Sequence, residues 1–230
     1  MYPRLLQAGE QGLVIEFGDA IDPALNQRVV ELAASLSNEK LGGILEIVPT
    51  YRSLMVYFDP LVAPRDKLGA SILQRLSKGA STEPPNAPAM IVEIPVCYGG
   101  DFGPDLDYVA TRAGLTIDKV VALHCSRPYR IYMLGFMPGF PYLGGLPKEI
   151  ATPRLDSPRT KVPAGSVGIA GDQTGFYPVE SPGGWRIIGR TPLALGAEDF
   201  LQAPLYAPGD HIRFTSIDRA EYERLAKARL

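Results

Sequence analysis

Residues 135–192 read GFMPGFPYLGGLPKEIATPRLDSPRTKVPAGSVGIAGDQTGFYPVESPGGWRIIGRTP and hold 11 Gly and 9 Pro in 58 positions. Such a share of glycine and proline, without a period, is typical of disordered segments. Large apolar and aromatic side chains lie between these breakers, however, and a disordered segment has few of them. Because glycine permits tight turns and close backbone approach, we expect short strands joined by stiff turns that form a binding surface.

The segments around this tract predict a β-rich second half of the chain. Strands are expected at residues 90–96, 129–134, 166–170, 176–179, 185–189 and 211–217. Helices are expected at residues 104–113, 117–125 and 218–230. Many short strands with one helical insertion favour a closed or nearly closed antiparallel barrel.

The first 80 residues predict a smaller α+β layer in the order ββαββα. Asp22-Pro23 gives an N-cap followed by proline at the first helical position, which is a strong helix start. The expected strands are residues 4–8, 13–17, 44–48 and 54–58, and the expected helices run from Pro23 to Gly42 and from Pro64 to Lys78. Residues 79–89 are small, polar and proline-rich, which is typical of a linker.

These patterns divide the chain into an α+β N-terminal domain at 1–82, a linker at 83–89 and a mainly-β barrel domain at 90–230. The composition is 46% hydrophobic and 21% charged, with a net charge of −2 in 230 residues. This balance excludes nucleic acid or an anionic membrane as the main partner. Since no signal peptide and no long apolar run occurs, we expect a cytoplasmic protein.

Several kinds of catalytic site are excluded by their missing motifs. The sequence has no G-x-x-x-x-G-K-[ST] phosphate loop, no G-x-S-x-G elbow and no H-E-x-x-H pair. With two histidines and two cysteines that lack C-x-x-C spacing, it also has no metal-ligand set.

His124 is the first candidate for a site residue. At helical spacing it ends an apolar stripe with Ile117, Val120 and Val121. One interpretation is a core histidine bonded to the backbone, and the other is a site residue where the helix meets the Gly/Pro-rich tract. The spacing leaves both open.

A cationic group is the second candidate. Residues 127–192 hold eight basic and four acidic side chains, an excess of four in a chain of net charge −2. Arg154 and Arg159 each follow a proline, so these stiff positions lose less entropy on pairing with an anion. Each arginine alone is compatible with a solvated surface position. As a group they favour a small anionic ligand or an acidic partner.

Gln173-Thr174-Gly175 is the third candidate, because an amide side chain both donates and accepts and suits an amide or carboxylate ligand. The alternative is a polar hairpin turn. Nearby, Gly165 permits close backbone approach, so that backbone N–H groups could face an anion together with Ser166.

Four motifs together resemble the kinase-A-inhibitor/allophanate-hydrolase-subunit-1 family. They are GFMPGFPYLGGLP at 135–147, PR-x-x-VPAGSVGIAG at 158–171, QTGFYP at 173–178 and SPGGW-x-x-IGRTP at 181–192. The resemblance covers most of the chain and is strongest from His124 to Pro192. It implies that the barrel is a cyclophilin-like domain, which agrees with the linker and the strands predicted above.

The resemblance further implies an obligate partner, the allophanate-hydrolase-subunit-2-like protein (the C subunit of 5-oxoprolinase), and a third protein (the A subunit of 5-oxoprolinase). Such a complex is expected to open 5-oxo-L-proline to L-glutamate with ATP, which the assembled complex would bind. In that reaction His124 and Arg159 are expected to be catalytic. Substrate or anion binding is expected at Gln173, Arg190, Arg154, Gly165 and Ser166.

Two other functions occur among similar proteins and stay open at this point. One is inhibition of a histidine sensor kinase, and the other is a role in an allophanate hydrolase or urea carboxylase-type enzyme. The barrel alone does not decide among these functions.

Overall fold

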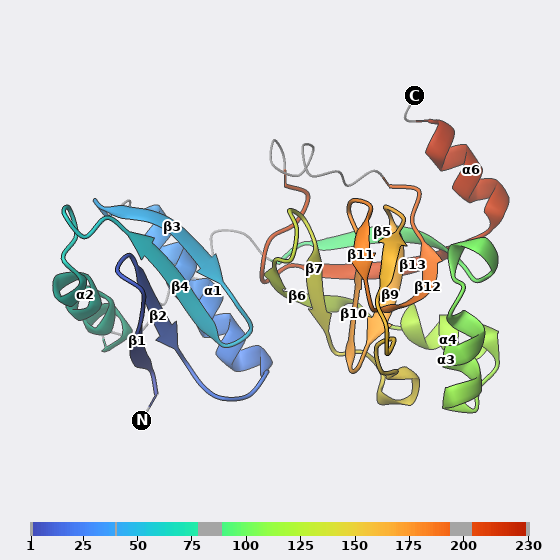
Figure 1. Ribbon diagram of the computed structural model, residues 1–230, viewed down its shortest axis with the longest axis horizontal. Coiled ribbons are helices and arrows are strands. Elements are labelled where there is room, and N and C mark those ends of the chain that lie inside the picture. The colour runs from blue at the N-terminus through green and yellow to red at the C-terminus, as the bar shows by residue number, and fades with distance from the viewer. Residues whose placement is uncertain (1, 40, 78–88, 194–203, 229–230) are drawn as a thin grey trace. The chain divides into compact units, whose positions relative to one another are not determined.

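The computed structural model describes residues 2–39, 41–77, 89–193 and 204–228. The chain divides into two compact units, Met1–Ala89 and Met90–Leu230 (Figure 1). The predicted linker at 83–89 lies almost entirely outside the described residues. The predicted domain boundaries therefore stay a prediction, and each unit is described by itself.

The first unit is a four-stranded antiparallel sheet with two helices. The sheet order is β1-β2-β4-β3. The elements are β1 (Arg4–Ala8), β2 (Gly12–Glu16), α1 (Pro23–Asn38), β3 (Ile44–Pro49), β4 (Ser53–Phe58) and α2 (Arg65–Ser77). Helix α1 begins where the sequence predicts, because the Asp22 carboxylate accepts hydrogen bonds from the backbone N–H groups of Ala24 and Leu25 at 2.8 and 3.0 Å.

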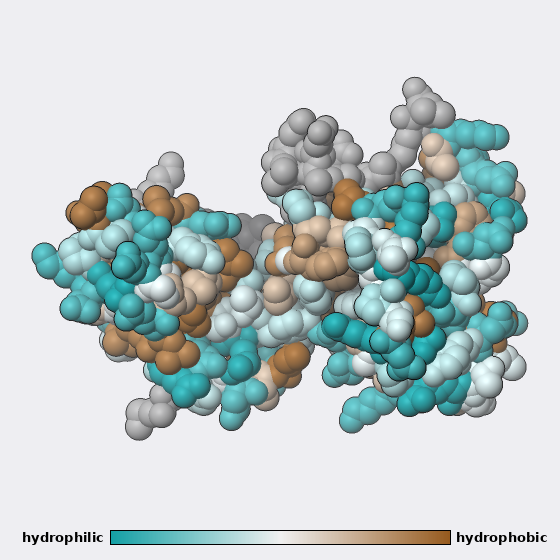
Figure 2. Space-filling model, viewed as in Figure 1, coloured by the Kyte–Doolittle hydropathy of each residue, from teal (hydrophilic) through white to brown (hydrophobic). Residues whose placement is uncertain are grey.

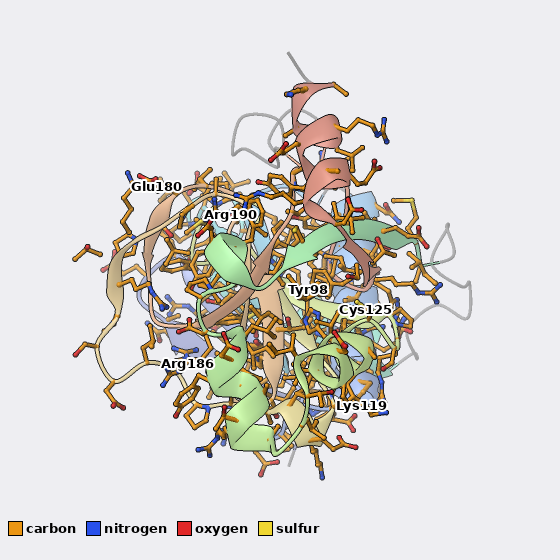
Figure 3. The ribbon with its side chains drawn as sticks, turned by 90° about the vertical axis from the view of Figure 1, so that its right-hand side faces the viewer. Tyr98, Lys119, Cys125, Glu180, Arg186 and Arg190 are labelled. Atoms are coloured by element: carbon orange, nitrogen blue, oxygen red, sulfur yellow. The ribbon has the colours of Figure 1, made fainter. Side chains whose placement is uncertain are left out.

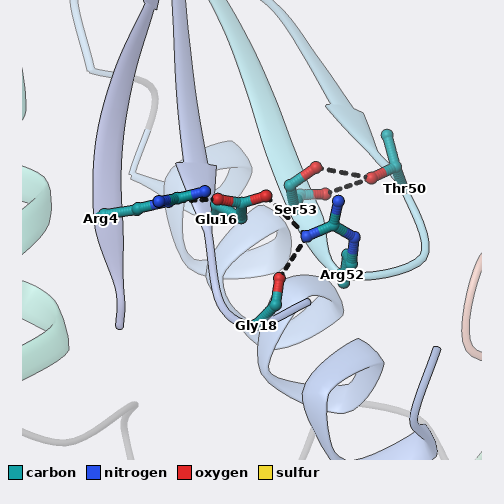
Figure 4. Close-up of polar contacts among 6 residues, drawn as sticks. All are labelled: Arg4, Glu16, Gly18, Thr50, Arg52 and Ser53. Atoms are coloured by element: carbon teal, nitrogen blue, oxygen red, sulfur yellow. Dashed lines mark hydrogen bonds and ion pairs between the residues drawn. The ribbon is translucent and has the colours of Figure 1, made fainter. Parts of the chain in front are cut away.

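Polar contacts of the buried residues Glu16 and Asn26 hold the end of this sheet. Figure 4 shows the Glu16 carboxylate between the guanidinium groups of Arg4 and Arg52. The hydrogen bond and ion pair to Arg4 are the main cause that lowers the pKa of Glu16. The buried amide of Asn26 on α1 donates to the carbonyls of Thr50 and Tyr51 in the β3–β4 turn. Together these bonds fix the turn against the helix.

The second unit is built around a closed barrel of strand order β10-β7-β6-β13-β5-β12-β9. Its strands are β5 (Ile91–Tyr98), β6 (Tyr129–Leu134), β7 (Pro141–Gly144), β9 (Ser166–Ala170), β10 (Gln173–Phe176), β12 (Arg186–Arg190) and β13 (His211–Ile217). The other elements are η1 (Gly100–Phe102), α3 (Leu106–Ala113), α4 (Ile117–His124), η2 (Lys148–Ile150), β8 (Arg159–Val162), β11 (Ser181–Gly183) and α6 (Arg219–Lys227). The predicted barrel is thus present, with α3 and α4 as the helical insertion.

The barrel is mixed and not purely antiparallel, which corrects the prediction. Strand β13 pairs with β5 in parallel, from His211 opposite Ile91 to Ile217 opposite Cys97. Parallel neighbours need a long connection between them, and here the rest of the barrel provides it. The pattern of short strands carried no signal for this pairing, because it joins the first and last strands of the unit.

The strand predicted at 176–179 is also wrong. The structure places β10 at Gln173–Phe176, paired with β9 through a turn at Gly171 and Asp172. Gly171 has φ +63°, the left-handed conformation that such a turn requires. Gln173, Thr174 and Gly175 are therefore strand residues, so the hairpin-turn interpretation of this tripeptide is wrong.

The strands separate two apolar layers. Inside the barrel lie Ile94, Val96, Tyr129, Ile131, Leu143, Val167, Ile169, Phe176, Ile188, Ile212 and Phe214. On the outer side, between the barrel and the β8–β11 ribbon, lie Phe140, Val162, Ala170, Tyr177, Trp185 and Ile187. We call this second group the outer aromatic layer. Its presence explains why the Gly/Pro-rich tract is ordered.

Candidate functional site

The predicted site residues fall into three places in the barrel unit. Ser166 on β9 and Arg190 on β12 lie opposite each other, and Gly165 directly precedes β9. His124 lies inside the barrel. Arg154 and Arg159 lie by the outer aromatic layer, and Gln173 begins β10.

The first place is a row of side chains across three neighbouring strands. Ser166 on β9 is directly opposite Arg190 on β12, and Arg190 is directly opposite Cys97 on β5. Directly opposite residues of antiparallel strands share one face of the sheet, with Cβ atoms about 4.5–5.5 Å apart. The serine hydroxyl, the guanidinium and the thiol therefore form one row, which we call the Ser166–Arg190 row.

Two polar atoms of this row have no partner among the described residues. Ser166 is fully buried at 0% exposure, and its Oγ makes no hydrogen bond. The Nε atom of the half-buried Arg190 is likewise buried without one. A serine hydroxyl and a guanidinium N–H can both donate, so a ligand that satisfies both must offer acceptor oxygens. A carboxylate or a phosphate is such a ligand, and the positive charge of Arg190 favours either.

Gly165 fixes the backbone next to this row. It has φ +78°, its N–H donates to the Tyr177 carbonyl at 2.7 Å, and its carbonyl accepts from the Thr191 N–H at 2.9 Å. A Cβ atom at this position would lie 2.5 Å from the Thr191 carbonyl oxygen and 3.4 Å from Arg190 Cγ. Glycine is therefore required for the close approach that holds Ser166 beside Arg190.

Phe102 and Arg219 adjoin the row and were not identified from the sequence. The Cζ atoms of Arg190 and Arg219 lie 5.6 and 5.3 Å from the centroid of the Phe102 ring. Figure 3 shows Arg190 beside the short η1 helix that ends in Phe102. Cys97 was missed as well, and burial raises the pKa of its thiol, which keeps it neutral. The motif YGGDF at 98–102 was the available signal, since adjacent glycines after a strand mark a sharp turn.

His124 lies in the barrel interior and not on a surface. It is fully buried and stacks on Phe214 at a centroid distance of 4.6 Å. Its Nε2 is 2.8 Å from Thr174 Oγ1, and its Nδ1 is 2.7 Å from the Tyr98 hydroxyl. Figure 3 labels Tyr98 and Cys125, which come together at this end of α4.

The hydrogen bond that Thr174 donates determines where the protons lie on the His124 ring. The Thr174 hydroxyl donates its one hydrogen to the Gly168 carbonyl at 3.0 Å, so it must accept from His124 Nε2–H. Nδ1 is then the acceptor, and the Tyr98 hydroxyl donates to it. Burial lowers the pKa of His124 to about 3, so the imidazole is neutral near pH 7. Burial also raises the pKa of Tyr98 and Cys125, and the whole network is uncharged.

Arg159 makes a two-pronged ion pair with Asp105, which precedes α3. Both nitrogen–oxygen distances are 2.9 Å, and Asp105 also accepts the backbone N–H of Ile187 at 2.7 Å. Arg186 lies 3.9 Å from the same carboxylate, and its Cζ lies 3.9 Å from the Tyr108 ring centroid. The carboxylate of Asp105 is mostly buried and was missed from the sequence. It joins α3, β8 and β12, and it compensates the charge of Arg159.

The remaining predicted residues lie away from the Ser166–Arg190 row. Arg154 is exposed, with its Cζ 5.9 Å from the Trp185 ring centroid in the outer aromatic layer. Gln173 pairs with Ala170 across the β9–β10 turn. In the part of the chain that the structure describes, no group of three His, Cys, Asp or Glu side chains could hold a metal ion. Within the same residues, every helix is too short or too polar to cross a membrane.

Comparison with known proteins shows where this chain belongs. Residues 3–204 match the family described as carboxyltransferase domain, subdomain C and D. The chain is 42% identical to the 5-oxoprolinase B subunit of Bacillus subtilis (strain 168), over 94% of this chain and 93% of that protein. It is 40% identical to the 5-oxoprolinase B subunit of Escherichia coli O157:H7, over 90% of this chain and 92% of that one.

Solved structures share the fold. The crystal structure of TTHA0988 superposes with a TM-score of 0.78 at 39% identity, and this chain covers 40% of that longer chain. The Kluyveromyces lactis urea amidolyase superposes with a TM-score of 0.76 at 21% identity, and the chain covers 15% of it. The family match and the identity over nearly the full length agree, and the chain belongs to the family of the 5-oxoprolinase B subunit.

Proposed function

We propose that this chain is one component of an ATP-dependent 5-oxoprolinase complex that hydrolyses 5-oxo-L-proline to L-glutamate. Its similarity to 5-oxoprolinase B subunits over nearly their whole length supports this assignment. The predicted cyclophilin-like barrel domain, the α+β domain before it and a cytoplasmic location are parts of the same proposal.

The observation that carries the proposal at the residue level is the pair of unsatisfied donors in the Ser166–Arg190 row. The substrate has one carboxylate, which offers two acceptor oxygens and a negative charge. In the proposal, Ser166 Oγ–H and the guanidinium of Arg190 bind this carboxylate. Gly165 keeps the two donors together, and Phe102 forms the apolar side of the site.

The chemistry explains why ATP is needed. A lactam is a resonance-stabilised amide, so water attacks it slowly. Transfer of the γ-phosphoryl group to the lactam oxygen forms an O–P bond, releases ADP and makes the carbon electrophilic. Water then adds to that carbon, the C–N bond breaks as nitrogen takes a proton, and a second water releases phosphate from the acyl phosphate. These steps need stabilisation of negative charge and a group that moves protons.

The predicted roles of Arg159 and His124 depend on what the partners do to this chain. Arg159 is paired with Asp105, and both ring nitrogens of His124 are engaged. We therefore propose that, in the absence of the partners, both residues act as positioning residues. Arg159 holds Asp105 in place, and His124 holds Thr174 in place on β10. An acid/base role for His124 would require the partner proteins to open its network. Gln173 lies opposite Ala170, four residues along β9 from Ser166, so a substrate whose carboxylate is held by Ser166 and Arg190 does not reach it. The proposal therefore withdraws its predicted role in orienting the amide and keeps Arg154 as a residue that faces an acidic surface.

The partners supply what this chain lacks. Since the sequence has no phosphate loop, the proposal assigns ATP binding to the assembled complex. The partners are the allophanate-hydrolase-subunit-2-like protein (the C subunit of 5-oxoprolinase) and the A subunit of 5-oxoprolinase. Alone, this chain is expected to be inactive.

Reconstitution tests the assignment. The purified chain is combined with both partners, and glutamate release is measured with ATP and 5-oxo-L-proline. We expect release only when all three proteins and ATP are present. The same three proteins and ATP are also tested with allophanate in place of 5-oxoproline, and consumption of allophanate is measured. Turnover of allophanate without turnover of 5-oxoproline would assign the chain to the allophanate hydrolase or urea carboxylase-type alternative.

A further inference from the structure

Arg219 brings a second positive charge to the Ser166–Arg190 row. The parallel pairing of β13 with β5 places Ile217 opposite Cys97, and Cys97 lies opposite Arg190 in the row. The chain continues from Ile217 into α6, whose first residue is Arg219. Burial raises the pKa of the Cys97 thiol, and the positive charge of Arg219 partly opposes this shift. The strand register thus brings the second guanidinium to the row.

The Phe102 ring is the point at which the two guanidinium groups meet. The Cζ atoms of Arg190 and Arg219 lie 5.6 and 5.3 Å from its centroid. The backbone of η1 (Gly100–Phe102) lies close to β12, since a Cβ atom on Gly103 would be 2.0 Å from the Ile188 carbonyl oxygen. Figure 3 shows Arg190 beside this short helix. The close backbone contact therefore fixes the ring that both cations share.

The two guanidinium groups differ in what they already bind. The buried Nε of Arg190 has no partner among the described residues. Arg219 pairs with Asp101 at 3.3 Å and with Glu223 at 3.5 Å. The side chains of Arg219 and Asp101 are 63% and 83% exposed, and ion pairs so exposed contribute little to stability. A ligand can therefore replace Asp101 as the partner of Arg219 at small cost in free energy.

Helix α6 leaves Arg219 free to approach a ligand. None of its described residues is buried, and Figure 2 shows mostly hydrophilic surface where Figure 1 places this helix. Its ring contact to η1 is that of Tyr222 with Phe102, at a centroid distance of 4.4 Å. Elements with little buried apolar surface move at low cost in free energy.

We propose that Arg219 is a second anion-binding residue of this site, which takes a small ligand with two acceptor groups. Ser166 and Arg190 bind one group, Arg219 exchanges Asp101 for the other, and the hydrocarbon part of the ligand lies on Phe102. A guanidinium suits this role because it donates several hydrogen bonds and stays positively charged.

This inference rests on the proposed function, in which the first acceptor group is the carboxylate of 5-oxo-L-proline. The second is then the lactam end of the same molecule. That end gains negative charge when it receives the phosphoryl group, and after hydrolysis it is the second carboxylate of glutamate. Arg219 therefore binds the part of the substrate at which the charge grows during the reaction.

Two ligands of equal length test the second binding group. Glutarate carries a carboxylate at each end of a five-carbon chain, and pentanoate carries only one. Both are titrated into the full chain at one ionic strength, and the affinities are measured by NMR. We expect glutarate to bind about fivefold more tightly, which exceeds the factor of about two that its equivalent ends supply. Arg219→Gln is expected to remove this excess and to leave the affinity for pentanoate within about twofold.

Matched variants on α6 and η1 separate a direct contact from a general effect of charge. Arg224→Gln removes the same charge from the same helix, where Arg224 pairs with Glu221, and is expected to keep the preference for glutarate. Asp101→Asn removes the carboxylate that competes for Arg219 and is expected to raise the affinity for glutarate about twofold. Glu221→Gln removes an equal negative charge and is expected to leave that affinity unchanged.

Kinetics in the reconstituted complex separate binding from catalysis. Because the contact of Arg219 strengthens as charge develops at the lactam end, its loss affects the transition state more than the bound substrate. We expect Arg219→Gln to lower kcat about tenfold or more and to change KM by less than about threefold. Arg219→Lys keeps the charge and is expected to recover part of kcat. Arg224→Gln is again the control.

The outcomes distinguish this inference from the proposed function. Equal affinities of glutarate and pentanoate, including no measurable binding of either, would overturn the second binding group, and so would equal effects of Arg219→Gln and Arg224→Gln. An unchanged kcat in Arg219→Gln would overturn its role in a complex that hydrolyses 5-oxo-L-proline, while the proposed function stands. If the parent complex does not hydrolyse 5-oxo-L-proline but the preference for glutarate depends on Arg219, the proposed function fails and the site for two anionic groups stands.

Discussion

Ser166 and Arg190 place two hydrogen-bond donors side by side without acceptors of their own. A buried donor without an acceptor costs about 1–3 kcal/mol of folding free energy. The folded chain is therefore less stable than it would be if the Ser166 hydroxyl had an acceptor. The sequence identified both residues as candidates, from the glycine-rich motif and the cationic excess. It could not show that they face each other, because their pairing depends on the register of β9 and β12.

Ser166→Ala removes the unsatisfied hydroxyl with little change in volume. We expect the free energy of unfolding of the chain alone to stay the same or rise by about 1 kcal/mol, measured by urea denaturation. In the reconstituted complex, the KM for 5-oxo-L-proline is expected to rise. Ser126→Ala is the control, because the Ser126 hydroxyl is exposed and donates to the Leu123 carbonyl. A clear loss of stability in Ser166→Ala would show that the hydroxyl has an internal partner.

His124 predicts a pH dependence of stability. Its pKa falls to about 3 in the folded chain, below the value near 6.5 of an unfolded histidine, so the unfolded state binds more protons between these pH values. The contribution of the neutral His124 to the free energy of unfolding is complete above pH 6.5 and is lost as pH falls toward 3. Between these values the free energy of unfolding falls by at most about 1.4 kcal/mol per pH unit.

Urea midpoints between pH 5 and 7 test this, because carboxylates with lowered pKa values act only below that range. We expect His124→Gln to be less stable at pH 7 and to lose most of the pH slope. Burial also lowers the pKa of His211, so it contributes to the same slope, and His211→Gln is expected to remove a smaller part of it than His124→Gln does. An unchanged slope in His124→Gln would contradict the buried neutral imidazole.

Asp105 sets how three elements of the barrel unit meet. Its carboxylate binds Arg159 of β8 and the backbone of β12, and it lies directly before α3. The sequence singled out Arg159 but not Asp105, because the two are 54 positions apart and no local pattern links them. Local sequence signals predicted an element correctly where a capping residue sets its first residue, as at Asp22-Pro23. They failed where strand pairing sets the structure, as in the parallel pair of β5 and β13 and in the position of β10.

Asp105→Ala leaves the guanidinium of Arg159 and the Ile187 N–H without their acceptor. Breaking a buried pair costs about 3–5 kcal/mol, and since Arg159 is 32% exposed we expect a loss near or below the lower limit, about 2–3 kcal/mol. Lys161→Ala removes an exposed ion pair with Glu180 on the same ribbon and is expected to change stability by less than about 1 kcal/mol. Both variants are compared by thermal and by urea unfolding. If Asp105→Ala lost no more stability than Lys161→Ala, the Asp105 contacts would not hold these elements together.

At the scale of the whole molecule, a closed barrel with an aromatic outer layer presents two distinct surfaces. One carries the half-buried Arg190, which lies opposite the buried Ser166, and the other carries the exposed side chain of Phe136 between β6 and β7. The composition and the glycine–proline tract predicted the barrel. They could not predict that His124 would be sealed inside it, because helical spacing does not tell which layer the apolar stripe packs against.

The carboxylate site is tested most directly by comparing two substrates in the reconstituted complex. 5-Oxo-L-proline carries the carboxylate, and 5-oxo-L-prolinamide replaces it with a neutral amide. We expect Arg190→Gln to raise the KM for 5-oxo-L-proline at least tenfold and to leave the KM for the amide within about twofold, since a lost charge-assisted hydrogen bond is worth about 1.5–3 kcal/mol. Equal changes for both substrates, or no change for either, would contradict carboxylate binding by the Ser166–Arg190 row.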